Sequence, residues 1–461
     1  MPTLSTPTPS QAVATHLSLS SPIELYRGLQ QTPEQYLAVA RNFLQEQLKK
    51  AAKLKCDLPD SPEDLHQWVI DGNARTTQAY RQYLDTRKQG QPRRYFANRS
   101  QALFFLRGVA PTKLVDGSWL YGVLPQWQDL RLHALVRTYL EELGEGEPEQ
   151  NHVVLYKQLL AQHELEDIES LPASHFVQGA QQLALGHLAQ DFLPELIGYN
   201  LGYEQLPLHL LITTYELNEL GIDPYYFQLH VTIDNADTGH AHKAASAVLD
   251  NLPVTGDAQM FYRRVRLGYL LNDLALSSTE VINSFCLEQE LYRVLEQKAL
   301  VARNMHSDFC RIEGRTINEW LSQQGQIGDF LAALEKRGWI QRDEDPAQSR
   351  FWQLVQGNRA PMFGVFSHYE LQLLHDWIAG EWLINDQPNR PKKFVQPARN
   401  QSPDNRARAG DFSAEQQILE KELRTLDGAS RTRRLIQLMS PAHHYKPAGL
   451  LATRLFNQLQ A

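Results

Sequence analysis

The feature of this sequence that most constrains its fold is the spacing of its apolar side chains, which recur at steps of three and four residues. In SPIELYRGLQQTPEQYLAVARNFLQEQLKKAAK, residues 21–53, the side chains of Leu25, Leu29 and Tyr36 follow this spacing and would share one face of an α-helix. Runs with the alternating pattern of a half-buried strand are scarce. Prolines such as Pro224 fall where helices should begin or end. The pattern predicts an all-α protein.

Composition and charge narrow the class of protein. Of the 461 residues, 42% are hydrophobic and 21% are charged, which is typical of a globular chain. The net charge of −8 gives no reason to expect a nucleic-acid partner, and no apolar run is long enough to cross a membrane. Cys56, Cys286 and Cys310 are too widely spaced for a zinc ribbon or a disulfide framework, and the N-terminus lacks the pattern of a secretory signal. We therefore expect a cytoplasmic protein.

The chain divides into segments of different character. Residues 387–410 are rich in Pro, Asn, Arg and Gln, a composition typical of linkers, whereas helical periodicity dominates before them. We expect a disordered tail (1–20), an N-terminal helical extension (21–95), a helical bundle (96–305), a small, mostly helical C-terminal domain (306–383), a linker (384–412) and a C-terminal helical tail (413–461).

Residues 230–242, HVTIDNADTGHAH, concentrate histidines and aspartates. On a helix that begins near Pro224, the side chains of His230, Asp234 and Asp237 would share one face. Burying such a face without partners is costly, but its imidazole and carboxylates are suitable ligands for iron or manganese. The alternative is a solvent-exposed polar face, although the flanking sequences PYYFQL and AASAVL are apolar and indicate a buried helix. This segment alone leaves both interpretations open.

A second candidate lies in YLEELGEGEPEQNHVVLYKQLL, residues 139–160. A helix ends near Glu142, and His152 opens the next one. Glycines between them allow a sharp turn that can return His152 beside Glu142. Helical bundles build dinuclear carboxylate sites by combining Glu and His residues from separate helices. The alternative is an acidic helix end next to a solvated histidine.

Taken together, the two segments resemble a known family. Glu142-x9-His152, followed further along the chain by His230-x3-Asp234-x2-Asp237, is similar to the heme-oxygenase-like diiron oxidases, which are also described as iron-containing redox enzymes. The resemblance covers about residues 100–305. It implies that the 96–305 segment is a heme-oxygenase-like metal-binding bundle. It also implies about two Fe(II) ions per chain, with O2 as co-substrate.

The resemblance also implies a ligand set. Glu142 and His152 take the positions of the second ligand helix, and Asp116 takes that of the first-helix carboxylate, where the family more often has Glu. On the third helix His230 and Asp234 take the first two positions. The complete set of implied metal ligands is Asp116, Glu142, His152, His230, Asp234 and Asp237.

Three further residues are weaker candidates. The family usually closes the third helix with a histidine, where this chain has Asp237. His240 stands three residues later, and we interpret it as a supporting residue because a continuous helix would not aim it with His230. Glu195 is either an additional carboxylate at the site or a favourable charge at the N-terminus of its own helix. Glu204, near the end of that helix, is a further candidate.

The function that these patterns predict is that of a nonheme diiron, O2-activating oxidase or oxygenase. Its substrate would be a small organic molecule, and amino-acid-derived compounds are one class that fits. Two alternatives stay open: a heme-binding helical bundle, and a metal-free helical scaffold that binds a partner. The sequence also leaves open the choice between iron and manganese, and whether the chain forms a homodimer.

Overall fold

The computed structural model describes residues 21–234, 239–357, 359–382 and 404–460. Within these ranges, no description extends to the side chains of residues 232–234 and 404–413. The expected disordered tail and residues 384–403 of the expected linker lie outside the described residues.

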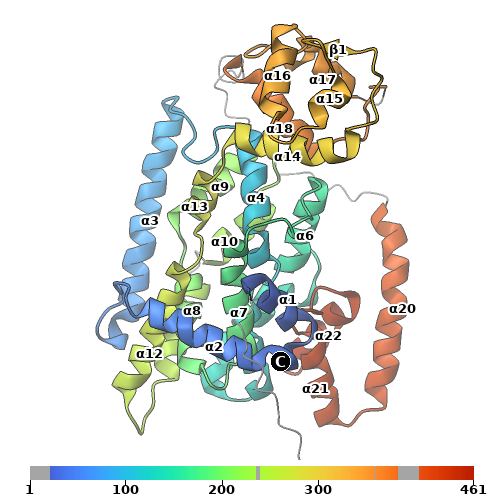
Figure 1. Cartoon of the computed structure of the whole chain (residues 1–461). Helices are drawn as coiled ribbons and strands as arrows, with labels where there is room; N and C mark the ends of the chain where they lie inside the picture. Colours follow the sequence, from blue (N-terminus) through green and yellow to red (C-terminus); the bar gives the residue numbers. More distant parts are fainter. Residues whose placement is uncertain (1–20, 235–238, 358, 383–403, 461) are drawn as a thin grey trace, which may run out of the picture.

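The prediction of an all-α fold is confirmed, because helices make up nearly all the regular structure of the described chain (Figure 1). The two short strands, Arg311–Ile312 (β1) and Arg315–Thr316 (β2), form one antiparallel hairpin. Among the described residues, no helix is both long enough and apolar enough to cross a membrane.

The first described helix starts at a well-formed cap. Ser21 and Glu24 form a capping box at the first helix, which also has Pro22 at its first position. Proline again opens the second helix. The first helix packs on α7 and the third on α9. The bounds are Pro22–Gln31 (α1), Pro33–Ala51 (α2), Pro62–Asp64 (η1) and Leu65–Lys88 (α3).

The central bundle is built from short helices that surround a buried core (Figure 1). Its most extensive helix pair is α8 with α12. A Cβ atom at Gly198 of α8 would overlap the carbonyl oxygen of Val265 on α12, so this close approach requires glycine. The bounds are Arg99–Lys113 (α4), Ser118–Gln126 (η2), Leu130–Leu132 (η3), His133–Glu142 (α5), Gly144–Gly146 (η4), His152–Gln162 (α6), Ala173–Phe176 (η5), Val177–His187 (α7), Leu193–Tyr203 (α8), Leu208–Glu219 (α9), Tyr225–Asp234 (α10), His240–Asp250 (α11), Ala258–Leu270 (α12) and Leu271–Asp273 (η6).

A smaller group of helices lies at one end of the bundle, at the top of Figure 1. It shares a second hydrophobic core with α4 and α6. The carboxylate of Asp376 on α18 accepts hydrogen bonds from the backbone and the hydroxyl of Ser100 on α4, at 2.9 and 2.7 Å. The bounds are Leu287–Ala302 (α14), Ile317–Leu321 (α15), Ile327–Lys336 (α16), Pro346–Gln348 (η7), Arg350–Val355 (α17) and His368–Ala379 (α18). Ser278–Asn283 (α13) precedes them in the chain and packs on α4 in the bundle.

Of the last three helices, the second and third contact elements of the bundle, and the first packs on the third. The Tyr139 hydroxyl of α5 donates a 2.5 Å hydrogen bond to the carbonyl of Met439, and Arg454 donates to the carbonyl of Gly146 at 2.7 Å. These contacts fix the turn between α5 and α6. The first of the three helices begins within the segment expected to be a linker. Their bounds are Asp404–Arg424 (α20), Gly428–Leu438 (α21) and Pro447–Asn457 (α22).

Candidate metal centre

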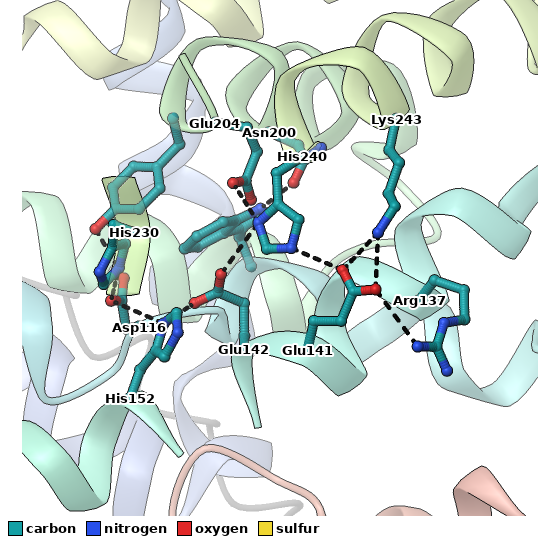
Figure 2. Close-up of polar contacts among 12 residues, drawn as sticks. Asp116, Arg137, Glu141, Glu142, His152, Asn200, Glu204, His230, His240 and Lys243 are labelled. Carbon is teal, nitrogen blue, oxygen red and sulfur yellow. Dashed lines mark hydrogen bonds and ion pairs between the residues drawn. The ribbon is translucent and has the colours of Figure 1, made fainter. Parts of the chain in front are cut away.

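Four titratable side chains converge in the middle of the bundle (Figure 2). Asp116 lies in the turn between α4 and η2, Glu142 ends α5, His152 opens α6, and His230 lies on α10. Each offers one possible ligand atom, and these atoms all lie within 4.8 Å of one another. The first three side chains are buried and His230 is partly buried. We call these four residues group A.

The turn between α5 and α6 brings Glu142 and His152 together. Gly144 has a φ of 61°, and a Cβ atom there would overlap the backbone nitrogen of Asn151, so the turn requires glycine. The Asn151 side chain caps the start of α6 and donates a 3.1 Å hydrogen bond to the carbonyl of Leu143. The Gly-containing turn that the sequence predicted is therefore present, and it returns His152 beside Glu142.

Within group A, atoms of Glu142 and His152 lie close together without hydrogen-bond partners in the described part of the chain. His152 Nδ1 lies 2.6 Å from Glu142 Oε2 and 3.8 Å from Asp116 Oδ2. The first pair is not aligned as a hydrogen bond, and neither ring nitrogen of His152 nor Glu142 Oε2 has a hydrogen-bond partner among the described residues. Buried polar atoms in this condition are destabilising. A metal ion that accepted a lone pair from His152 and one from Glu142 would give these atoms a partner, so this set of donor atoms fits a metal ion.

His230 is oriented by its own helix. Its Nδ1 lies 2.9 Å from the carbonyl oxygen of Tyr226, one turn earlier on α10. A hydrogen bond donated by Nδ1–H leaves Nε2 to face Asp116 Oδ2, at 3.3 Å. Metal-binding histidines commonly use one nitrogen for a backbone carbonyl and the other for the metal. The geometry therefore presents Nε2 as the ligand atom.

Both carboxylate oxygens of Asp116 accept hydrogen bonds from tyrosine side chains. The hydroxyls of Tyr203 and Tyr226 donate to its Oδ1 and Oδ2 at 2.8 and 2.5 Å. Burial alone would raise the pKa of Asp116, but Lys113, His152 and His230 outweigh it and hold this pKa well below its usual range. Asp116 is therefore an ionised carboxylate with a fixed orientation.

A second group lies on the other side of Glu142. His240 Nδ1 is 3.0 Å from Glu204 Oε2 and 3.6 Å from Glu142 Oε1. Glu142, Glu204 and His240 again place their ligand atoms within 4.8 Å of one another, and all three are buried. We call them group B. Glu142 belongs to both groups, with Oε2 toward His152 and Oε1 toward His240, as a carboxylate between two metal ions would.

Neighbouring carboxylates favour the protonated form of each of the two central histidines. Burial lowers the pKa of each imidazole, but neighbouring carboxylates outweigh it. Glu142 and Asp116 raise the pKa of His152 to about 10, and Glu204, Glu141 and Glu142 raise the pKa of His240 to about 11. Histidines must lose these protons before they bind a metal. In the metal-free protein, the two protonated imidazoles therefore supply the positive charge that metal ions would otherwise supply next to the carboxylates.

A third carboxylate borders group B. Glu141 Oε2 lies 2.7 Å from His240 Nε2, and both Glu141 oxygens accept hydrogen bonds from Lys243 at 2.7 Å (Figure 2). Arg137 approaches at 3.4 Å. Burial raises the pKa of Glu141, but His240 and Lys243 lower it to about 2. This carboxylate orients His240 and is itself balanced by two cations.

The structure brings together six of the residues singled out in the sequence: Asp116, Glu142, His152, Glu204, His230 and His240. The backbone of Asp234 ends α10, but its side chain and all of Asp237 lie outside the described residues. Both aspartates stay predictions.

Glu195 lies in neither group. Arg264 of α12 binds its carboxylate with two hydrogen bonds, at 2.6 and 2.7 Å. Glu204, which directly follows the helix that carries Glu195, belongs to group B instead. The residues that sequence reasoning did not find are Glu141, Lys113, Tyr203 and Tyr226, for which composition and spacing gave no signal.

One local expectation was wrong. A single helix was expected to run through residues 230–242, but Gly239 has an extended backbone and α11 begins at His240. The direction of the His240 side chain is therefore not set by the helix that carries His230. Asp116 is followed by Gly117, which has a φ of 77°, and then by the 3-10 helix η2.

These observations define an all-α protein with a buried centre of histidines and carboxylates. Residues 103–273 match the model of the family described as iron-containing redox enzyme, and this segment contains both groups. The resemblance seen in the sequence is thus confirmed over these residues, and the bundle has a heme-oxygenase-like fold. Comparisons with curated proteins and with solved structures gave no significant match.

Proposed function

We propose that this protein is a nonheme diiron oxidase or oxygenase that uses O2 to oxidise a small organic substrate. The observation that carries the proposal is the arrangement of groups A and B around Glu142, in which buried ligand atoms of His152 and Glu142 lack hydrogen-bond partners among the described residues. The family match to iron-containing redox enzymes supports the choice of iron.

The proposed ligands divide between the two groups. Asp116, His152 and His230 would hold one ion, and Glu204 and His240 the other, with Glu142 shared. Asp234 and Asp237 remain proposed ligands on the strength of the resemblance. Mixed imidazole and carboxylate sets suit iron and also manganese, so the metal content must be measured.

When bound, the iron pair would supply the electrons and the open coordination positions for O2 activation. The chain itself supplies orientation and exclusion of water. Tyr203 and Tyr226 fix Asp116, and the backbone of Tyr226 fixes His230. Because every member of the two groups except the partly buried His230 is buried, reactive species formed there would be kept from bulk solvent.

The carboxylates favour an iron pair over the heme alternative. A heme iron with one axial histidine would use one of the histidines and would leave Asp116, Glu142 and Glu204, which are at most 4% exposed, without a role as metal ligands. Ionised buried carboxylates without partners are strongly destabilising. Two divalent ions balance them directly.

An anaerobic Fe(II) titration tests the proposal. The parent chain is expected to bind about two irons and to consume O2 once loaded. Glu142→Gln keeps the size of the side chain and removes the shared charge, so it should bind markedly less iron. His163→Gln is the matched control, because it removes a buried histidine at the opposite end of α6, outside both groups.

Two results would overturn the proposal: a folded parent chain that binds no iron, or a Glu142→Gln variant that binds iron as the parent does. Circular dichroism establishes that each variant is folded. An intense absorption band on addition of hemin, lost with one histidine, would favour the heme alternative.

A further inference from the structure

A cavity of about 290 Å³ adjoins group A. Its lining includes the metal-ligand candidate His230, together with Lys113 and Tyr203, which are linked to Asp116. A volume of this order accommodates a small organic molecule. Because the cavity touches group A, it is the natural substrate site, and the choice of its ligand rests on the proposed function.

Lys113 is the one lysine or arginine among the described residues that line this cavity. Its side chain is 19% exposed. The ammonium donates a 3.0 Å hydrogen bond to Tyr203 Oη and lies 4.0 Å from Asp116 Oδ2. An ammonium carries three donor hydrogens, so this contact leaves donors for a ligand in the cavity.

Metal binding would change the charge balance around Lys113. An ion held by group A would be coordinated by Asp116, whose Oδ2 lies 4.0 Å from the Lys113 ammonium. The charge of Asp116 would then be shared with the metal. A largely buried ammonium in such surroundings requires another anion. Asp273, the one carboxylate among the described lining residues, is itself exposed.

The rest of the lining fits the remainder of such a molecule. Phe105, Phe227, Leu276 and Val281 provide apolar wall, which suits a hydrocarbon portion. We propose that the substrate is a small organic acid whose carboxylate pairs with Lys113 and whose hydrocarbon portion lies against Phe105 and Phe227, beside group A.

Calorimetric titrations of the Fe(II)-loaded protein under anaerobic conditions test this inference, with hexanoate, hexanamide and hexylamine as matched probes. A hydrogen-bonded charge pair contributes enough that hexanoate should bind about ten-fold more tightly than hexanamide. Lys113→Met should remove that preference and Lys113→Arg should largely keep it. Lys157→Met is the control, because Lys157 lies outside the cavity, over the ring of Tyr445.

The inference is overturned if the parent chain binds the three probes equally, if it prefers hexylamine, or if Lys113→Met keeps the preference for hexanoate. The probe comparison on the parent chain does not depend on the folding of any variant. Iron content is measured first. A chain that binds no iron overturns the proposed function, whereas an iron-loaded chain with no preference for the acid overturns the Lys113 assignment alone.

Discussion

The phenol of Tyr226 donates a 2.5 Å hydrogen bond to Asp116 Oδ2, the oxygen that also faces His152 and His230. Residues that orient metal ligands in this way typically change metal affinity by about 10- to 100-fold when they are replaced. We therefore expect Tyr226→Phe to weaken Fe(II) binding by about ten-fold while the fold is kept, as measured by anaerobic titration.

Tyr156→Phe provides the matched control. Tyr156 is also fully buried and packs against the ring of Tyr226, but its hydroxyl donates to the backbone carbonyl of Leu106. It makes no hydrogen bond to Asp116. Equal iron affinity in the two variants would show that the hydroxyl of Tyr226 does not support the site.

His444 makes the stability of the metal-free protein depend on pH. Burial, with the nearby His152 charge, lowers the pKa of His444 to about 3, whereas the unfolded chain titrates near 6.5. As the pH falls below 6.5, the unfolded state takes up a proton that the folded state does not, so stability is lost. Between pH 7.5 and 5.5 this histidine should cost about 1 kcal/mol of unfolding free energy.

Urea unfolding of the parent and of His444→Gln at both pH values isolates this contribution, because other titrating groups cancel in the difference. The variant should lose less stability than the parent on acidification. An identical loss in the two proteins would mean that His444 is not held neutral beside Asn151, 3.2 Å away.

At the scale of helices, the contact between α8 and α12 depends on glycine. Gly198→Ala would place a methyl group against the carbonyl of Val265, and such overpacking typically costs about 1–3 kcal/mol. Gly428→Ala is the control, since α21 leaves the space beside Gly428 open and alanine favours a helix. Thermal or urea unfolding should show a clear loss for the first variant and none for the second. Equal stability would contradict the close packing.

Helical periodicity was sufficient to predict the class of fold, because apolar spacing is a local property of the sequence. It could not locate the start of α11, since the polar residues before His240 continue a helical pattern, and the extended backbone at Gly239 is visible only in the structure.

The choice between Glu195 and Glu204 was not predictable for a related reason. They are nine residues apart (204 − 195), which places them on opposite faces of a helix at 100° per residue. Glu195 forms its hydrogen bonds with Arg264, which is distant in sequence. Tertiary packing decides which face of α8 lies toward His240. The spacing of residues within the segment does not predict that face.

In the whole molecule, the site is closed by segments that are far apart in the chain. The C-terminal helices contact the turn between Glu142 and His152 through Arg454 and through His444, which lies beside Asn151. The expected helical tail thus contributes to the same core as the bundle. The match to the iron-containing family spans residues 103–273, so these supporting contacts come from outside the matched segment.

The central claim is that Glu142 joins two metal ions, and a crystal structure of the Fe(II)-loaded protein with anomalous differences at the iron edge tests it most directly. We expect two iron peaks about 3.5–4 Å apart, a spacing typical of two-metal sites. One peak should lie beside His152 and His230, the other beside His240 and Glu204, and both should contact Glu142. A single peak, or iron bound away from Glu142, would contradict the claim.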